Sequence, residues 1–418
     1  MNDKRGDLPF RSADILLPRN CDLSLWSVVA CDQYTSRPEY WQRVENQVGR
    51  APSAFRLILP ESCLDGPSVE TDITEINNTM ARYLREGRFQ EYPDALIYVE
   101  RALRSGKVRR GLVGAADLEQ YDYEPGSTTA IRSTEETVMS RVPPRVAVRK
   151  HAPVELPHAM LLVDDPRRAI LEPLSARTGE MELLYDFELM ERGGHVKGWL
   201  LTRELRDGVL QALREHQAER DGLLFAVGDG NHSMAAAKEC YERRKGLTDP
   251  SQWANLPSRY ALCEIVNLHD PAVEFTPIHR VVFGVEPNKL LDALMEHYPS
   301  AVQGRSEGHV LPFAVSRWSQ GEITVTKPEA QLPVGTLQRF LDVYTAAHPK
   351  VRVDYIHGAD EARKLARERE DAVAFLLPPL DKHRLFHSVL RDGPLPRKTF
   401  SMGDAQDKRF YLEARKIR

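Results

Sequence analysis

The stretch FAVGDGNHSMAAAK, residues 225–238, constrains the fold most, because it changes from a buried strand to a helix within a few residues. The apolar residues 223–227 are typical of a short buried strand. Gly228 and Gly230 allow backbone conformations that other residues rarely adopt. Residues 233–245, followed by Gly246, are typical of a helix with a glycine stop. Together with the mixed order of strand and helix patterns along the chain, this junction predicts an α/β, mixed α+β architecture.

The turn at residues 228–233 also predicts a binding site for an anion. The start of a helix presents N–H groups and a partial positive charge, which favour phosphate. A carboxylate at Asp229 would repel phosphate unless it binds a cation, and Mg²⁺ takes one or two carboxylates together with phosphate oxygens. We therefore expect Asp229, Gly230, Asn231, His232 and Ser233 to form a phosphate site, with Asp229 as the metal ligand. The alternative is that Asp229 or Asn231 only caps the helix.

Residues 131–150, IRSTEETVMSRVPPRVAVRK, place a glutamate among arginines. Ser133 and Glu136 fit a capping box at the start of a short helix that the prolines at 143 and 144 would end, which leaves Glu135 for chemistry. Beyond the prolines, residues 145–149 are interpreted as a strand with Arg145 and Arg149 on one face. Because the arginine fork suits phosphate oxygens, we expect anion binding here, and the alternative is a solvated charged face. The candidate anion ligands in this stretch are Arg132, Thr137, Arg141 and Arg145.

The other expected elements follow from periodicity and turn residues. We expect a strand at 24–30, a helix that Ser36 caps and Gly49 ends, a helix at 71–88 and a β-hairpin at 96–123. Helices at 201–220 and 287–297 and a strand at 371–377 follow. The loop at 124–129 suggests a boundary, so we divide the chain into segments 1–125, 126–285 and 286–418. Two further stretches add candidate ligands: His279 and Arg280 within 276–280, and Lys398 and Thr399 in a loop after a strand.

The composition excludes several functional classes. The formal net charge is -4, so no global positive field attracts nucleic acid or anionic lipid. The five cysteines are scattered without C-x-x-C spacing, which argues against disulfides or structural zinc and favours a reducing compartment. Because no apolar run approaches the ~20 residues of a membrane span, we expect a cytoplasmic protein. The partners that we expect are small molecules. The G-x-G-x-x-G and G-x-x-x-x-G-K-[ST] motifs of common nucleotide sites are missing.

The chain resembles a family of long bacterial proteins that includes the pyrophosphate-dependent L-serine kinases. The stretches that carry this resemblance span nearly the whole chain: SVVACDQYTSRPEYW, IRSTEETVMSRVPPR, ELPHAMLLVDDP, FAVGDGNHS and PRKTFSMGDAQDKRFYLEARKI. The central part is also similar to the sulfiredoxin/ParB-type fold, whose small-molecule kinases carry a D-G-x-H-R turn and an upstream P-H-E motif. Asp229, Gly230 and His232 match the turn, with Ser233 in place of arginine. Glu135 matches the upstream glutamate, with Thr134 in place of histidine.

The resemblance implies a kinase that uses Mg²⁺ and transfers a phosphoryl group from pyrophosphate to the hydroxyl of free L-serine. It implies that Glu135 is the base for that hydroxyl and that Asp229 and His232 serve catalysis. It also implies a sulfiredoxin/ParB-like central region. We expect a cleft between lobes, because Glu135, Asp229 and Lys398 must converge if this mechanism holds. The alternatives are a kinase with ATP or ADP as donor or a related hydroxy-amino acid as acceptor, a phosphatase or pyrophosphatase, and a non-catalytic protein that senses an anion or amino acid.

Overall fold

The computed structural model describes residues 7–35, 37–63, 66–156, 159–220, 222–315 and 319–418. The chain forms two compact units, one made of Met1–Glu274 with Met402–Arg418 and the other of Phe275–Ser401. Each unit contains both helices and strands, so the predicted mixed α+β class is confirmed. The division into three segments at residues 126 and 286 stays a prediction.

A large mixed sheet organises the first unit. Its strands are β1 (Phe10–Arg11), β5 (Ile97–Ala102), β6 (Val108–Asp117), β7 (Tyr121–Asp122), β8 (Ile131–Ser133), β10 (Met160–Val163), β11 (Glu182–Glu188), β12 (His195–Leu200), β13 (Phe225–Asp229) and β14 (Tyr260–Asn267). Within the described residues their order is β11-β12-β5-β6-β14-β10-β13-β8-β7, with β1 beside β6. Three neighbouring pairs are parallel, namely β10 with β14, β13 with β8, and β7 with β8.

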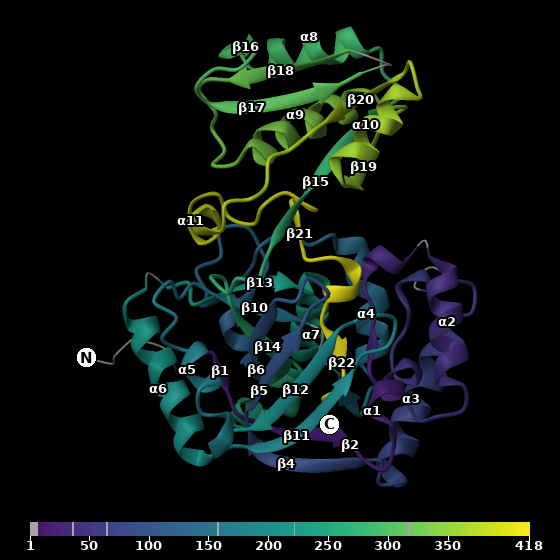
Figure 1. Ribbon diagram of the computed structural model, residues 1–418, viewed down its shortest axis with the longest axis vertical. Helices are drawn as coiled ribbons and strands as arrows, with labels where there is room; N and C mark the ends of the chain where they lie inside the picture. Colours follow the sequence, from purple (N-terminus) through teal and green to yellow (C-terminus); the bar gives the residue numbers. More distant parts are fainter. Residues whose placement is uncertain (1–6, 36, 64–65, 157–158, 221, 316–318) are drawn as a thin grey trace. The chain divides into compact units, whose positions relative to one another are not determined.

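Both faces of this sheet are buried, because successive residues of a strand point to opposite sides. Along β6, Val113 and Ala115 belong to one core cluster, whereas Leu112 and Ala116 belong to the other. The helices α2 (Pro38–Val48) and α3 (Val69–Arg85) contribute to the first cluster, and α6 (Arg203–Ala218) and α7 (Asn231–Lys245) to the second. Figure 1 shows α6 on one side of the strands and α2 and α3 on the other.

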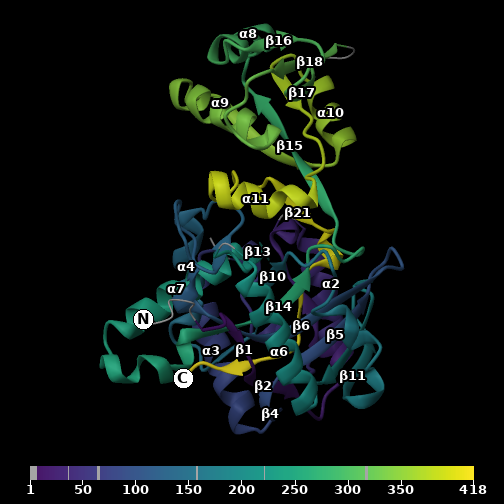
Figure 2. The same ribbon diagram turned by 90° about the vertical axis from the view of Figure 1, so that its left-hand side faces the viewer.

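Short elements connect the two ends of the chain within the first unit. The strand β3 (Val28–Val29) pairs with β22 (Phe410–Tyr411), and β9 (Val154–Glu155) pairs with β23 (Arg415–Lys416). Nearby, β2 (Ala13–Pro18) pairs with β4 (Phe89–Ala95), and α1 (Leu23–Trp26) and α5 (Glu172–Ser175) are single turns. The helix α4 (Val142–Arg149) lies against α7 through Val142 and Val146, which contact Ala235 and Ala236 (Figure 2).

The second unit has its own sheet and core. Its strands are β15 (Phe275–Phe283), β16 (Ala301–Gln303), β17 (His309–Ala314), β18 (Gln320–Val325), β19 (Arg352–His357) and β20 (Ala372–Phe375), and β21 (Phe400–Met402) pairs with β15. Within the described residues their order is β16-β18-β17-β20-β15-β19. The helices are α8 (Pro287–His297), α9 (Pro333–Ala347), α10 (Ala359–Arg367) and α11 (Lys382–Asp392). Ala362 and Ala366 of α10 pack on Val281 of β15 and Ala374 of β20.

Several predicted elements are confirmed. The helix at 287–297 is α8, the hairpin at 96–123 is β5 with β6, and the strand at 371–377 contains β20. The predicted helices at 71–88 and 201–220 correspond to α3 and α6. Gly49 ends α2 with a φ of 52°, as expected, and the capping residue predicted for this helix, Ser36, lies outside the described residues. Among the helices that the structure describes, none has the length and apolar character needed to cross a bilayer.

Several local predictions are wrong. Residues 24–30 form α1 and the short β3 instead of one strand, because the Asp22 side chain accepts the Ser24 N–H and caps a helical turn. Ser133 lies in β8 and caps no helix, and residues 145–149 are helical. The two prolines at 143 and 144 begin α4 instead of ending a helix, since the first helical turn leaves N–H groups unpaired and tolerates proline. The helix α7 also begins at Asn231, two residues before the expected start at Ser233.

Candidate functional site

The turn between β13 and α7 has the conformation that its glycines predict. Gly230 has a φ of 86°, in the left-handed region that favours glycine. A Cβ added at Gly230 would lie 2.8 Å from Ala159 Cα, so no larger residue fits without a shift. Gly230 is itself the N-cap, and no side chain of the described residues caps the helix. Capping by Asp229 or Asn231, the alternative reading of this motif, is therefore wrong.

Asp229 faces a lysine from the C-terminal segment. The Nζ of Lys408 lies 3.4 Å from Asp229 Oδ2, and the Lys408 side chain is only 7% exposed. The Gly230 N–H donates to Asp229 Oδ1 at 3.1 Å. The Asp229 carboxylate therefore lies between a buried ammonium group and a backbone amide, at the point where α7 begins.

Two arginines hold the backbone around Lys408. Arg101, which is 1% exposed, donates to the carbonyl oxygens of Gln406, Asp407 and Lys408. Arg109 Nη1 donates to the carbonyl of Asp407 at 2.8 Å. Burial, with the nearby charge of Arg109, lowers the pKa of Arg101 to about 9, so its guanidinium remains charged at neutral pH. These bonds fix the main chain beside Lys408 and thereby place its ammonium group next to Asp229.

A buried ion cluster anchors the next residue of the same segment. Arg409 lies 2.5 Å from Glu264 of β14 and 2.5 Å from Glu413, and all three side chains are fully or almost fully buried. The Tyr185 hydroxyl donates to the second oxygen of Glu413 at 2.6 Å. Removing one member would leave an uncompensated buried charge, which is strongly destabilising. The segment that carries Lys408 is therefore fixed on both sides.

The strand β8 brings a second polar stretch to the same edge of the sheet. It runs parallel to β13 and ends at Ser133, opposite Val227, two residues before β13 ends at Asp229. Ser133 Oγ lies 2.5 Å from Asn231 Oδ1 and 2.9 Å from the carbonyl of Glu135, and Thr134 Oγ1 donates to the carbonyl of Val227 at 2.6 Å. The half-buried Glu135 thus follows directly after two side chains that bind the β13–α7 junction.

His232 accepts a hydrogen bond from the chain that follows Glu135. The Val138 N–H donates to His232 Nε2 at 3.2 Å. Because Nε2 is the acceptor, the neutral imidazole carries its proton on Nδ1, which makes Nδ1 the donor. The hydroxyl of the adjacent Thr137 is buried and has no hydrogen-bond partner among the described residues. This hydroxyl therefore can bind a polar ligand at this edge of the sheet.

The amides of the turn are partly used within the protein. Besides the Gly230 N–H, the N–H groups of Ser233 and Met234 are engaged, since both donate to the carbonyl of Gly230. In the part of the chain that the structure describes, the Asn231 N–H has no acceptor. The start of α7 thus offers fewer amides to an anion than the sequence suggests.

The candidate arginines differ in their surroundings. Arg132 is 9% exposed and donates to the carbonyl of Thr129 at 2.9 Å, and burial lowers the pKa of its guanidinium. The carbonyl of Arg141 accepts a hydrogen bond from Arg145 Nη1 at 2.7 Å. Arg145 also lines a hollow of about 160 Å³ beside the start of α7. The polar lining consists of Arg145, Arg149, Glu155, Ser233 and Tyr411, and the remaining lining residues are apolar.

The remaining candidates belong to the second unit. His279 is 4% exposed and its Nδ1 accepts the Leu377 N–H at 3.0 Å, and burial together with nearby cationic groups lowers its pKa to about 4. Arg280 donates to the carbonyls of Lys398 at 2.9 Å and Arg397 at 3.1 Å, so it holds the loop that contains Lys398. Thr399 Oγ1 donates to the carbonyl of Pro396 at 2.6 Å. The sequence suggested that this loop follows a strand, but it follows the helix α11. The convergence of Lys398 with Glu135 and Asp229 stays a prediction.

Lys408 is the site residue that the sequence did not reveal. It lies in the stretch MGDAQDKRFYLEARKI, which is part of the resemblance but has no motif that marks one lysine. A signal was nevertheless present, since Lys408 and Arg409 directly precede an apolar pair that forms β22. Two adjacent cations at the start of a buried strand need acidic partners.

Comparisons with known proteins give one family and several distant structures. A family model described as "Protein of unknown function (DUF1015)" matches residues 8–344. No curated protein matches the chain. A free serine kinase in complex with AMP is similar at 10% identity and a TM-score of 0.40, over 70% of this chain and 92% of the kinase. A conserved hypothetical protein from Pyrococcus furiosus is similar at 11% identity and a TM-score of 0.38, over 70% of this chain and 90% of that protein. SbnI with a C-terminal truncation from Staphylococcus aureus is similar at 10% identity and a TM-score of 0.36, over 72% of this chain and 82% of that protein.

Proposed function

The chain belongs to the DUF1015 family, and we propose that it is a phosphotransferase that moves a phosphoryl group from pyrophosphate to the hydroxyl of free L-serine. The products are O-phospho-L-serine and orthophosphate. The observation that supports this proposal most directly is the buried Lys408, held 3.4 Å from Asp229 where α7 begins. A fixed ammonium group beside a helix start is suited to the charge of a phosphoryl group in transfer.

Charge neutralisation and positioning account for most of the proposed rate enhancement. Phosphoryl transfer needs little covalent chemistry from the protein, because the transition state spreads its charge over the phosphoryl oxygens. Lys408 and the Asn231 N–H would contact those oxygens, and His232, at the start of α7, would lie beside the leaving phosphate. Since the backbone bonds from Arg101 fix Lys408 in advance, little reorganisation is needed during the reaction.

Mg²⁺ fits this site as an ion that binds together with the donor. The described residues contain no group of three or more His, Cys, Asp or Glu side chains that could hold a metal alone. Mg²⁺ commonly binds one or two carboxylates together with substrate phosphates, so Asp229 would hold it. When bound, the ion would neutralise charge on the diphosphate. Because Lys408 already compensates Asp229, we expect weak metal binding without pyrophosphate.

Glu135 is the proposed base for the acceptor. The serine hydroxyl oxygen forms a bond to the phosphorus, the bridging P–O bond of pyrophosphate breaks, and the hydroxyl proton moves to the Glu135 carboxylate. A positioned base contributes about 10²–10⁴-fold to the rate, so the base supports the transfer but does not carry it alone.

The hollow beside Ser233 is the proposed place for the acceptor. Its volume of about 160 Å³ suits a small amino acid, and Arg145 in its wall can pair with a carboxylate. We propose that the Arg145 guanidinium binds the serine carboxylate and thereby directs the hydroxyl towards the start of α7. This assigns Arg145 to acceptor binding instead of phosphate binding.

The release of orthophosphate tests the proposal against its alternatives. Purified protein with Mg²⁺ would receive pyrophosphate, ATP or ADP at equal concentrations, each with and without L-serine. We expect release from pyrophosphate that depends on serine. Equal release from pyrophosphate without serine would indicate a pyrophosphatase. A nucleotide-dependent kinase would leave ADP or AMP instead of orthophosphate, so phosphoserine that forms only with ATP or ADP would indicate that class. Neither orthophosphate nor phosphoserine from any donor would indicate a non-catalytic binding protein.

A further inference from the structure

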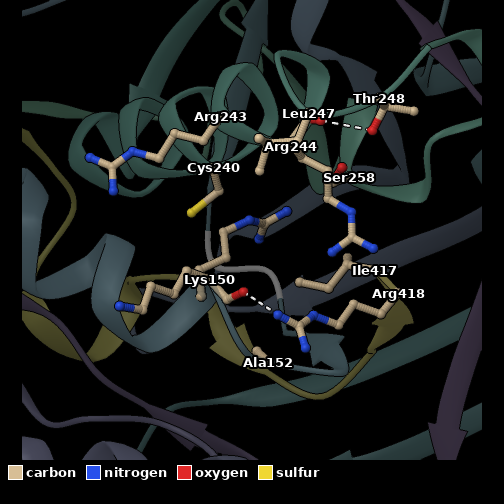
Figure 3. A pocket seen from close by; sticks show the side chains of 11 residues that line it. Lys150, Ala152, Cys240, Arg243, Arg244, Leu247, Thr248, Ser258, Ile417 and Arg418 are labelled. Atoms are coloured by element: carbon tan, nitrogen blue, oxygen red, sulfur yellow. Dashed lines mark hydrogen bonds between the residues drawn. The ribbon is translucent and has the colours of Figure 1, made fainter.

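A second polar cavity lies at the opposite end of α7 from the candidate site. It has a volume of about 420 Å³, and five of its lining side chains are cationic: Arg149, Lys150, Arg243, Arg244 and Arg418. Figure 3 shows Arg243 and Arg244 on the helix at one side of the cavity and Lys150 and Arg418 on the segments at the other side. Since a helix rises ~1.5 Å per residue, Arg244 lies ~20 Å along α7 from Asn231. The cavity therefore lies far from the start of α7, although it shares Arg149 and Ala152 with the hollow beside Ser233.

The cationic groups of this cavity are only partly compensated. None of the lining residues, all of them described in the structure, is acidic. Arg149 Nη1 pairs with Glu155 at 2.5 Å, but Arg149 Nη2 is buried without an acceptor among the described residues. Arg243 pairs with the exposed end of Glu239 at 2.7 Å. Lys150 and Arg244 make no ion pair with any described residue. Cationic groups around one hollow repel one another, and a bound anion relieves this repulsion.

The end of a helix explains only part of this cluster. Cationic side chains in the last turn are favoured by the helix dipole, which accounts for Arg243 and Arg244 without a ligand. The same effect at the end of α4 favours Arg149 and the C-cap residue Lys150, so only Arg418, which follows β23, is left unexplained by a helix end. The Arg418 guanidinium donates to the carbonyl of Lys150 and contacts His151 Nδ1 at 3.2 Å, so these two segments are joined at the cavity wall.

We propose that this cavity binds a small molecule that carries at least two phosphoryl groups. Guanidinium groups bind phosphate oxygens in pairs, and four arginines in a cavity wall without acidic residues suit more than one phosphate. The volume lies within the ~300–1,000 Å³ typical of small-molecule sites, which leaves space for an organic part. Leu247, Ile417 and Ala152 provide an apolar wall for that part.

Calorimetric titration with inorganic tripolyphosphate, ADP and adenosine tests this proposal. Omitting Mg²⁺ and serine prevents phosphoryl transfer, and the Lys408→Met background weakens anion binding at the candidate site. In that background we expect tripolyphosphate and ADP to bind and adenosine not to bind. Adding Lys150→Gln with Arg244→Gln should weaken the binding of tripolyphosphate and of ADP by about tenfold or more, because each substitution removes a charged hydrogen bond. The matched control, Arg203→Gln with Arg214→Gln on the exposed face of α6, should leave binding unchanged.

Alkylation of Cys240 supplies a measurement that is local to the cavity. Cys240 lines the cavity, and burial raises the pKa of its thiol, so we expect slow reaction with iodoacetamide. Saturating tripolyphosphate should slow the modification of Cys240 further, as followed by peptide mass spectrometry, while Cys21 reacts at an unchanged rate. Equal affinity of tripolyphosphate for the Lys150/Arg244 variant and its control would overturn the proposal. So would the absence of binding by both tripolyphosphate and ADP.

Discussion

Replacing Lys408 by methionine removes the buried ammonium group beside Asp229 while keeping a side chain of similar length. At the observed separation of 3.4 Å and an effective dielectric constant of ~20, the two charges attract by about 5 kcal/mol before desolvation is counted. The Asp229 side chain is 26% exposed, so water compensates much of the lost attraction. We therefore expect the free energy of unfolding to fall by about 1–3 kcal/mol, between the values for exposed and buried pairs. Loss of one fixed charge at the transferring group should lower serine-dependent turnover by about 10²–10³-fold.

The matched control is Lys416→Met in the same C-terminal segment. Lys416 pairs with Glu91 at 2.7 Å, but both side chains are nearly half exposed, so the pair contributes less than about 1 kcal/mol. Urea unfolding would give the stability of both variants, and initial rates of orthophosphate release would give turnover. The reasoning would be refuted if folded Lys408→Met kept turnover within about twofold of the native protein, or if Lys416→Met lost as much.

Three further changes test other parts of the account. Glu135→Gln should reduce turnover by about 10²–10⁴-fold without changing the urea midpoint, and unchanged turnover would remove Glu135 as the base. Gly230→Ala places a Cβ 2.8 Å from Ala159 Cα at a φ of 86° and should lower the free energy of unfolding by about 1–3 kcal/mol. Gly208→Ala, in open space on α6, should raise it by about 0.5–1 kcal/mol. Urea unfolding that shows effects of the same sign for both variants would contradict this. The pKa of His279 is lowered from 6.5 to about 4, so the folded state favours the neutral ring. Its contribution to the free energy of unfolding should be complete above pH 6.5, fall by about 3 kcal/mol as the pH drops to 4, and change no further below that. His279→Gln should flatten this part of the pH profile of unfolding.

The sequence predicted elements well where local signals agree. The helix at 287–297 has a proline in its first turn and an apolar face, and both signals survive in α8. The β13–α7 junction was also predictable, because a left-handed backbone packed against Ala159 requires the glycine at 230. The same reasoning failed at the prolines at 143 and 144. Proline can end one helix or begin another, and the sequence does not show which side provides the partner, here α7.

The electrostatic part of the site depends on long-range packing. Lys408 approaches Asp229 because Arg101 and Arg109 from β5 and β6 hold the backbone of the C-terminal segment. No local pattern near Asp229 indicates that a lysine from this segment will be its partner. The cavity at the far end of α7 has the same origin, since its cationic residues come from three separate segments.

The most direct test of the proposed function is ³¹P NMR of the purified protein with pyrophosphate, L-serine and Mg²⁺, beside an identical sample without serine. The account predicts a phosphoserine resonance that grows together with orthophosphate, and neither resonance in the sample without serine. Orthophosphate that accumulates equally in both samples, or a pyrophosphate signal that stays constant in both, would contradict it.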